Sequence, residues 1–240
     1  MMITMITFSQ ITLQGKDAAK FLQGQLTVNV AKLTATPLAC AICNLKGRVQ
    51  FGLWASKIDD ETFALIISDD CLTALQAHLK KYGAFSKFST SEPMSVYPCV
   101  VDGVASFGDV VCGDFNTWAT VSITQGNYWI TADTSELFQP QELRLHQRGG
   151  VDYDKGCYIG QEIIARLYFK ASPKAYLHRV LLPLGTAANA GEKVDKVQIV
   201  NSVATTDGID ALVIGTPDDV AQAGQMLALP DTLSVSPARS

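Results

Sequence analysis

Residues 155–162 carry the strongest chemical pattern in the chain and read Lys-Gly-Cys-Tyr-Ile-Gly-Gln-Glu. Gly156 and Gly160 would let the backbone turn tightly and bring main-chain groups close to a ligand. A helix that begins at Gly160 would direct its free N–H groups to the same place. Lys155 and this helix end would favour the thiolate form of Cys157. The thiolate is the form of cysteine that acts as a nucleophile or as a metal ligand. Spacing alone leaves a second interpretation open, a glycine-rich turn around an inert, buried cysteine.

Polar side chains continue this pattern into the predicted helix. Arg166 follows Glu162 at the spacing of one helical turn, so we expect the two to form an ion pair. Gln161 lies at the predicted helix start. Together with Lys155, these side chains would shape the electrostatics of Cys157 or dock a partner.

The other cysteines and the histidines offer no second site. Cys40 and Cys43 form a Cys-x-x-Cys pair, but in a strand their side chains would point to opposite faces. No further pair has zinc-site spacing, so we predict no metal centre and six reduced thiols. His78, His146 and His178 are isolated from any triad arrangement, and we interpret them as structural or surface residues.

The composition excludes some classes of function. Of the 240 residues, 48% are hydrophobic and 18% charged, with a formal net charge of −4, which indicates a compact globular protein. Direct nucleic-acid binding is not expected, because phosphate contacts need clustered Lys and Arg. The chain has no targeting pattern and no apolar run that could span a bilayer. We therefore expect a cytoplasmic monomer without membrane contact.

The patterning of residues 1–90 predicts a sheet covered by helices on one side, an α+β layout. Turn residues separate the predicted elements: strand 3–13, helix 17–22, the hairpin 38–43 and 49–54, strand 62–67, a helix from 69 or 70 to 81, and strand 85–88. Gly47 suits the turn of the hairpin. We expect Asp69 or Asp70 to cap the second helix, and Lys80 and Lys81 to stabilise its C-terminal end.

The second half of the chain is richer in short β-like runs. Residues 93–118 predict one or two hairpins with turns at 102–103 and 113–114. After Pro173, brief apolar runs predict a small C-terminal β-barrel, followed by a frayed tail after Pro230. We expect a first region over 1–171, with lobes of about 1–90 and 91–171, and a second domain over 172–240.

The cysteine motif, followed by Ala165-Arg166, resembles the signature of the YgfZ family of folate-binding proteins, relatives of the glycine-cleavage T-protein. Four other segments fit this family in the same order: 21–27, 44–48, 81–87 and 138–141. The resemblance implies a GcvT-like folate-binding region with ferredoxin-like lobes around a central channel, and a C-terminal β-barrel. It also implies a role in maintaining iron–sulfur enzymes, such as the methylthiotransferases that modify tRNA.

The resemblance also implies a cofactor and the residues that hold it. The cofactor would be tetrahydrofolate or a one-carbon derivative. Trp118 matches an aromatic residue that holds the pterin in the family, and Phe8 takes the place of a second tryptophan; aromatic faces stack well on flat rings. Tyr158 and the two motif glycines would line the same channel, and Cys157 would face it.

Two departures from the family pattern affect the expected function. Residues 47–52 contain no acid where the T-protein carries its catalytic carboxylate, so aminomethyl transfer from glycine is not expected. The stretch between Lys87 and Trp118 is much shorter than in longer family members. Our leading hypothesis is a folate-binding accessory protein that uses Cys157. The alternatives are a folate-dependent one-carbon transferase with Cys157 or Glu162 in proton transfer, and an adaptor that does not bind folate.

Overall fold

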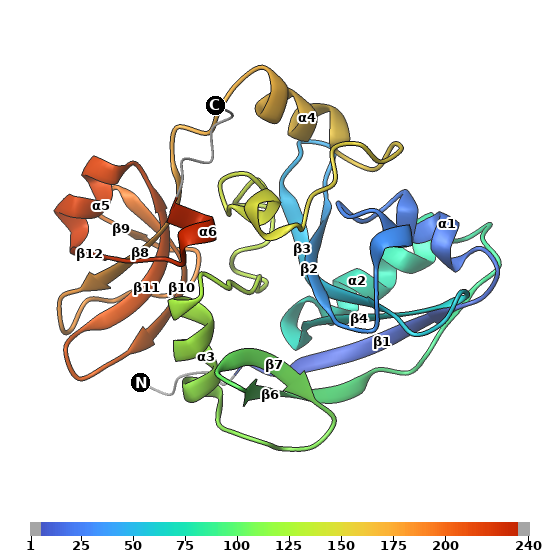
Figure 1. The fold of residues 1–240 in the computed structure, drawn as a ribbon, viewed down its shortest axis with the longest axis horizontal. Helices are drawn as coiled ribbons and strands as arrows, with labels where there is room; N and C mark the ends of the chain where they lie inside the picture. Colours follow the sequence, from blue (N-terminus) through green and yellow to red (C-terminus); the bar gives the residue numbers. More distant parts are fainter. Residues whose placement is uncertain (1–5, 235–240) are drawn as a thin grey trace.

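The computed structural model describes residues 6–234 and shows an α+β protein built on two antiparallel sheets (Figure 1). Strands β1–β7 form a seven-stranded sheet, and β8–β12 form a five-stranded sheet. In the figure, helix α3 (Phe115–Thr124) lies between the sheets at the bottom, and α4 (Gln161–Phe169) lies at the top. The predicted α+β class with a small C-terminal β unit is confirmed.

The larger sheet contains the predicted hairpin. Its strands follow the order β2-β3-β4-β1-β6-β7, with β5 paired to β1. The bounds are β1 Phe8–Gln14, β2 Leu38–Cys43, β3 Val49–Lys57, β4 Thr62–Ser68, β5 Ser89–Thr90, β6 Met94–Val101 and β7 Val104–Gly108. Gly47 turns the β2–β3 connection with a φ of +69°, a left-handed conformation that favours glycine.

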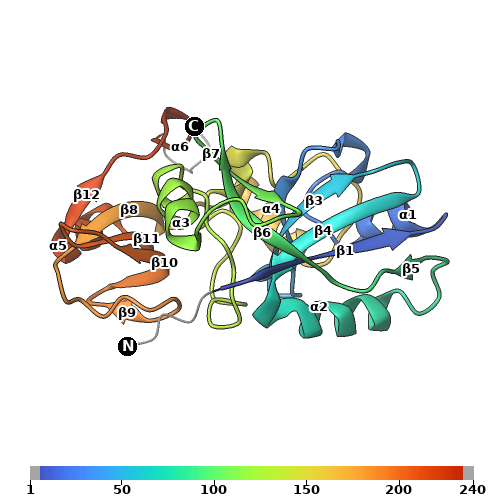
Figure 2. The same cartoon turned by 90° about the horizontal axis from the view of Figure 1, so that it is seen from below.

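Two helices cover one face of this sheet, and Figure 2 shows α2 lying along it. They are α1 (Ala18–Gln23) and α2 (Asp69–Tyr82), with a short 3₁₀ helix, η1, over Val30–Lys32. Asp69 and Asp70 occupy the first turn of α2, but Ser68 rather than an aspartate holds its N-cap position. The Ser68 hydroxyl donates 2.7 Å to the Ile130 carbonyl, so it fastens the strand end to a later segment.

Residues 85–88 do not form the strand that the sequence predicted. The Asp17 carboxylate accepts a 2.7 Å bond from the Lys87 N–H, and the Asp17 N–H donates to the Lys87 carbonyl. The Phe88 ring packs on Phe21, with centroids 4.7 Å apart. The segment is therefore anchored to the loop before α1, and pairing with β1 begins only at Ser89.

The smaller sheet follows the order β12-β8-β11-β10-β9. Its bounds are β8 Tyr176–Leu182, β9 Lys193–Val194, β10 Val197–Ala204, β11 Ile209–Gly215 and β12 Gln225–Leu227. Between β11 and β12, residues 217–223 form α5 (Pro217–Ala223), and Thr216 caps this helix by accepting a hydrogen bond from the Asp219 N–H. A final turn, α6, covers Asp231–Ser234.

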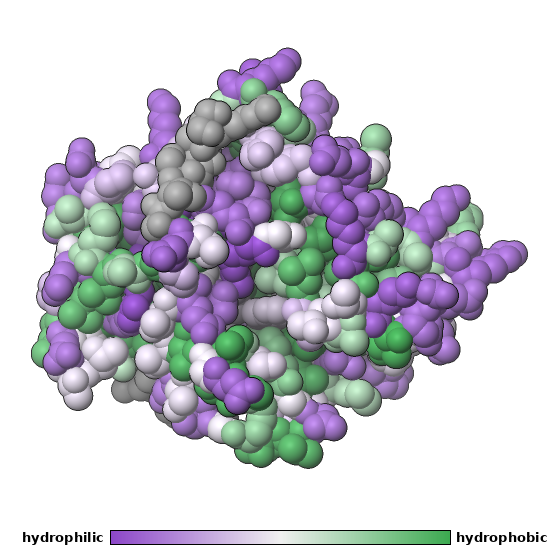
Figure 3. All heavy atoms as spheres, viewed as in Figure 1, coloured by the Kyte–Doolittle hydropathy of each residue, from purple (hydrophilic) through white to green (hydrophobic). Residues whose placement is uncertain are grey.

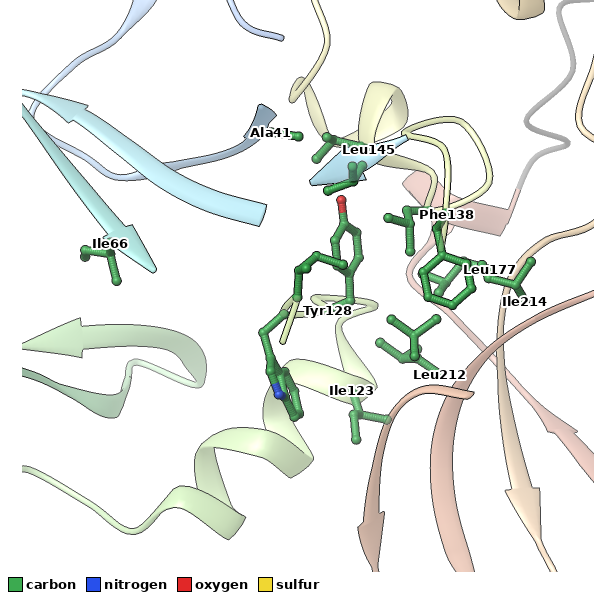
Figure 4. Close-up of a cluster of buried hydrophobic side chains, with 14 of the residues drawn as sticks. Ala41, Ile66, Ile123, Tyr128, Phe138, Leu145, Leu177, Leu212 and Ile214 are labelled. Carbon is green, nitrogen blue, oxygen red and sulfur yellow. The ribbon is translucent and has the colours of Figure 1, made fainter. Parts of the chain in front are cut away.

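A shared core joins the two sheets through residues 125–160, which contain η2 (Leu145–Arg148) and little other regular structure. Figure 4 shows Tyr128 at the centre, with its hydroxyl toward Leu145 and Ala41, and with Phe138 and Leu177 on the side of the smaller sheet. The buried Asn201 amide makes two 3.0 Å hydrogen bonds to the main chain of Trp129. Residues 125–160 are thus hydrogen-bonded to both sheets, through Asn201 of β10 and Ser68 of β4.

One expectation about the cysteines is wrong. Cys99 of β6 and Cys112, which follows β7, form a disulfide with their Cα atoms 5.5 Å apart, although the sequence predicted only reduced thiols. The β6–β7 hairpin brings these residues together from a separation of 13 positions, which the apolar runs around them did not reveal.

Candidate functional site

The cysteine motif is anchored by its first residue. Lys155 is buried, and its Nζ donates 2.7 Å to the Gln23 carbonyl and 2.5 Å to the Leu26 carbonyl, at the end of α1. The same ammonium lies 4.7 Å from the centre of the Tyr158 ring. Burial lowers the pKa of Lys155 to about 8. These contacts of Lys155 lie on the interior side of the loop, whereas the sequence predicted that Lys155 would act on Cys157.

The second end of the loop is wedged against the β2–β3 hairpin. Gly160 precedes α4 with a φ of +80°, and a Cβ there would lie 2.4 Å from the Asn44 carbonyl and 3.2 Å from the Gly47 Cα. Gly156, in contrast, has nothing within 4 Å of such a Cβ. Gln161 donates a 3.3 Å bond from its amide to the Lys155 carbonyl, which closes the loop on itself.

Cys157 projects from this fixed loop as an exposed free thiol. The other free cysteines of the described chain, Cys40, Cys43 and Cys71, are buried. Burial raises the pKa of Cys40 to about 12 and that of Cys71 to about 11, and it raises the pKa of Cys43 still further. Among the free cysteines of residues 6–234, only Cys157 is accessible to solvent, whereas burial disfavours the thiolate form of the other three.

The predicted pair of Glu162 and Arg166 is absent. Both side chains are exposed on α4, and neither forms an ion pair within residues 6–234. Charged side chains with this exposure gain little from pairing, because water solvates each of them. They contribute charge to the exposed surface of α4.

Cys40 and Cys43 lie on opposite faces of β2, as predicted. Cys40 belongs to the core under α1 and α2, whereas Cys43 belongs to the core shared with the smaller sheet. Among the described residues, no group of His, Cys, Asp or Glu could hold a metal ion. His78 is a satisfied structural histidine, with its Nε2 2.8 Å from the Gln25 amide oxygen.

The two predicted pterin residues lie together but are closed off. The rings of Phe8 and Trp118 have centroids 5.3 Å apart and are only 1% and 2% exposed. Trp129 packs 5.1 Å from Trp118, and a cavity of about 10 Å³ beside Trp54 and Trp129 has room for no more than one water. The indole N–H groups of Trp118 and Trp129 are buried and have no partner within the described chain. A heterocycle could satisfy these donors only if the cluster opened, so this role stays a prediction.

A much larger cavity, of about 530 Å³, lies immediately before the cysteine motif in the chain. Three segments meet there: residues 28–38, residues 149–154 and the end of α4. Its polar and aromatic lining residues are Asn29, Lys32, Asp152, Tyr153, Asp154, Tyr168 and Phe169. Volumes of this size are typical of small-molecule sites.

The walls of this cavity combine aromatic faces with fixed charges. Tyr153 and Tyr168 stack with centroids 3.8 Å apart, and Phe169 packs edge-on to Tyr168 at 5.0 Å. Lys32 donates 2.5 Å to Asp152, and this hydrogen bond lowers the pKa of Asp152 and raises that of Lys32. Aromatic rings, a carboxylate and an ammonium suit a heteroaromatic ligand that carries both N–H donors and an acid.

Sequence reasoning missed these cavity residues. Tyr153 precedes the motif by only two positions, yet its neighbour Lys32 lies far away in the sequence, so no spacing connects them. It also missed Glu142, whose pKa is raised by burial although its carboxylate accepts a 2.7 Å bond from the Gln139 N–H. Residues 47–52 contain no acidic side chain. Arg48 in this segment donates a hydrogen bond to the Leu137 carbonyl.

The chain is similar to known proteins in sequence and in fold. No family model matches the chain. An uncharacterized protein of Haemophilus influenzae is 27% identical over 91% of this chain and 89% of its own length. Proteins named tRNA-modifying protein YgfZ from Serratia proteamaculans and an Enterobacter species are 26% and 28% identical over 81% of this chain, and over 74% and 76% of their own lengths.

A solved structure defines the fold class. The glycine cleavage system aminomethyltransferase T of Bartonella henselae superposes with a TM-score of 0.64 over 87% of this chain and 76% of its own, at 11% identity. The protein therefore has the aminomethyltransferase T fold. Within that class, the sequence relatives and the cysteine motif support the predicted resemblance to the YgfZ family.

No helix within residues 6–234 has the length and apolar character needed to cross a membrane.

Proposed function

We propose that this protein is an accessory protein of tRNA modification that binds a reduced folate and acts through the Cys157 thiol. The names of its relatives support a role in tRNA modification. One observation carries the site: an exposed cysteine on a loop held at one end by buried Lys155 and at the other by Gly160. A fixed, accessible thiol can meet a partner in a defined geometry, as a buried thiol cannot.

We further propose that the folate ring occupies the cavity of about 530 Å³ beside the motif. Its aromatic lining suits stacking, and Asp152 could accept N–H donors from a pterin. Lys32, which is exposed at the same wall, could bind the glutamate carboxylate of the ligand. The Trp118 and Phe8 cluster is the competing location, and the experiment below distinguishes them.

The protein would hold folate rather than carry out aminomethyl transfer. A bound reduced folate supplies one-carbon units, but the hairpin lacks the acid that a transferase of this class would use. The partners we propose are iron–sulfur enzymes that modify tRNA, in the cytoplasm. Cys157 would meet such a partner at the tip of the β2–β3 hairpin, where Leu45 is 82% exposed.

The folate proposal is tested by anaerobic calorimetric titration of tetrahydrofolate into wild type and variants. Phe169→Ala and Asp152→Asn change the cavity, Trp118→Phe changes the buried cluster, and Cys157→Ala changes only the thiol. We expect saturable binding that weakens about tenfold in each cavity variant and is unchanged in the other two. Loss of binding in Trp118→Phe alone would favour the buried cluster.

Absence of binding in wild type would refute the folate proposal and favour the adaptor without folate. The one-carbon transferase alternative requires turnover of methylene-tetrahydrofolate by purified protein. If such turnover were lost in Cys157→Ala or Glu162→Gln, the accessory role would be replaced by an enzymatic one.

A further inference from the structure

The segment that follows α2 combines positive charge with exposed aromatic rings. Residues 80–87 read Lys-Lys-Tyr-Gly-Ala-Phe-Ser-Lys and lead from the last turn of α2 toward β5. Phe85 is completely exposed, at 102%, and Tyr82 is 47% exposed. A flat ring that protrudes in this way can bury its face only against a planar group of another molecule.

Contacts hold this segment in one shape. The Tyr82 and His78 rings lie 4.4 Å apart, centroid to centroid, and the Lys81 Nζ lies 5.2 Å from the centre of the Tyr82 ring. The Ser86 N–H donates 2.9 Å to the Gly83 carbonyl. An ordered turn therefore presents the exposed ring and the cations, which lowers the entropy cost of binding a ligand there.

The segment itself carries charge of one sign. Residues 71–91 contain no Asp or Glu, and their three lysines are Lys80, Lys81 and Lys87. All three lysines are exposed, and none of them forms an ion pair within residues 6–234. Their ammonium groups are thus available to an anionic partner.

The loop before α1 adds a fourth lysine beside this segment. The Asp17 carboxylate accepts 2.7 Å from the Lys87 N–H, and the Asp17 N–H donates to the Lys87 carbonyl, which brings the neighbouring Lys16 alongside. Asp17 is the acid in contact with the segment, and its carboxylate already has this partner. The Gly15 N–H donates 2.9 Å to the Glu61 carbonyl, so an acidic turn borders the surface on that side. The basic-aromatic patch, as we call this surface, consists of Lys16, Lys80, Lys81, Tyr82, Phe85 and Lys87.

The patch differs from the average of the chain. The formal net charge of −4 led us to expect no direct nucleic-acid binding, but four of the 19 basic side chains lie in this one patch. Cations bind phosphates, and aromatic rings stack on unpaired bases, so a surface that offers both is typical of single-stranded nucleic-acid sites. An acidic peptide would satisfy the lysines but offers no row of flat rings to Phe85.

We infer that the basic-aromatic patch binds an unpaired stretch of nucleic acid. Its lysines pair with phosphates, Phe85 stacks on one base, and Tyr82 borders the next. Figure 2 draws α2 leading into β5 at the right end of the molecule, with the smaller sheet at the left end. Figure 3 shows long hydrophilic side chains projecting from the right edge, where Figure 1 draws α1 and the loop that follows α2. The inference adds a binding surface beyond the proposed folate and thiol functions.

The test follows the fluorescence anisotropy of a labelled single-stranded RNA of about 10 nucleotides, within the usual site size of such surfaces. We expect the full chain to bind it saturably at low salt. The logarithm of the binding constant should fall against the logarithm of the salt concentration with a slope of about −2 to −3, as three or four phosphate contacts require. An abasic strand of equal length keeps the phosphates and should bind about tenfold more weakly.

Variants of the exposed ring separate stacking from general stickiness. Phe85→Leu keeps an apolar side chain and should weaken the RNA about tenfold, without effect on the abasic strand. Phe85→Tyr keeps the ring and should bind as the wild type does. Because Phe85 is completely exposed, neither change removes a packing contact from the folded protein.

Variants of the lysines test the phosphate contacts. Lys81→Gln with Lys87→Gln should weaken binding and make the salt slope shallower by about 1.4, the value for two lost contacts. Lys193→Gln with Lys196→Gln makes the same change of charge at exposed sites beside β9, in the smaller sheet. This control should keep both the affinity and the slope of the wild type.

The inference is overturned if the wild type does not bind the RNA, or if it binds phosphatidylglycerol vesicles and not the RNA. It is equally overturned if Phe85→Leu and Phe85→Tyr behave alike, or if the control at β9 weakens binding as much as the variant of the patch. All measurements are made without folate and can be repeated in Cys157→Ala, so failure of the proposed function would not change these outcomes.

Discussion

The Nζ of Lys155 donates 2.5 Å to the main-chain oxygen of Leu26, so the first residue of the cysteine motif ends inside the protein, at the turn after α1. This buried ammonium has carbonyl partners, Gln23 and Leu26, and no carboxylate among its described hydrogen bonds. The bond links two segments 129 positions apart, and it sets where the loop that displays Cys157 begins.

Lys155→Met should therefore lower stability and change its pH dependence. Loss of the two hydrogen bonds leaves buried carbonyls unsatisfied, at a cost of about 1–3 kcal/mol near neutral pH. Burial holds the folded-state pKa of Lys155 at about 8, below the value of about 10.4 in an unfolded chain. Between these values the unfolded state binds more protons, so this group makes stability rise with pH.

Chemical denaturation at about pH 7.5 and about pH 9.5 measures this contribution as a difference between wild type and variant. The free energy of unfolding of the wild type should increase relative to that of Lys155→Met as the pH rises through this window. An equal pH slope in both proteins would mean that Lys155 titrates as if it were exposed.

The two motif glycines should respond differently to alanine. At Gly160 a Cβ would meet the Asn44 carbonyl at 2.4 Å, and its φ of +80° is strained for any L side chain. Gly160→Ala should cost about 2 kcal/mol or more in thermal or chemical unfolding. Gly156→Ala meets open space and serves as the matched control, with an expected change within about 0.5 kcal/mol. Equal effects at both positions would show that the loop does not press on the hairpin.

Thiol reactivity should identify Cys157 alone. In the native protein without reductant, Ellman's reagent should modify a single thiol rapidly, because the other free cysteines are buried. Cys157→Ala should abolish the fast phase, whereas unfolding in denaturant should release the thiols of Cys40, Cys43 and Cys71. A fast phase that persists in Cys157→Ala would indicate that a buried cysteine becomes accessible in the native state.

Acid should destabilise the protein through its buried histidines. Burial lowers the pKa of His78 and of His178 to about 4 in the folded state. Unfolded histidines titrate near about 6.5, so the unfolded state binds more protons between these values, and stability falls as the pH drops through this window. His78→Gln can keep the contact to Gln25 and should flatten the acid slope. His178→Gln should do the same, and the double variant should show both effects together if the sites are independent. If the stability of His78→Gln fell with decreasing pH as steeply as that of the wild type, this would contradict a neutral, buried His78.

Local patterns in the sequence predicted much of the fold. The alternation in β2 and β3, the turn at Gly47 and the opposite faces of Cys40 and Cys43 all follow from residue types within a few positions. Helix α5 could also have been predicted, because Thr216-Pro217 is a local helix-start signal.

Long-range contacts explain what the sequence could not predict. Residues 85–88 turn away from the sheet because Asp17 binds Lys87, 70 positions apart. The direction of Lys155 depends on where α1 ends, and the cavity needs three distant segments. Residues 1–5 and 235–240, on which part of the first predicted strand and of the predicted tail fall, lie outside the described residues.

The claim that Cys157 is the functional thiol is tested most directly in cells that lack the gene. Such cells would carry wild type, Cys157→Ser or the exposed-site control Thr206→Ala, and methylthio-modified nucleosides in their tRNA would be quantified by mass spectrometry. We expect wild type and Thr206→Ala to restore the modification, and Cys157→Ser, although expressed and folded, to leave it at the level of the empty strain. Full restoration by Cys157→Ser would contradict the central claim.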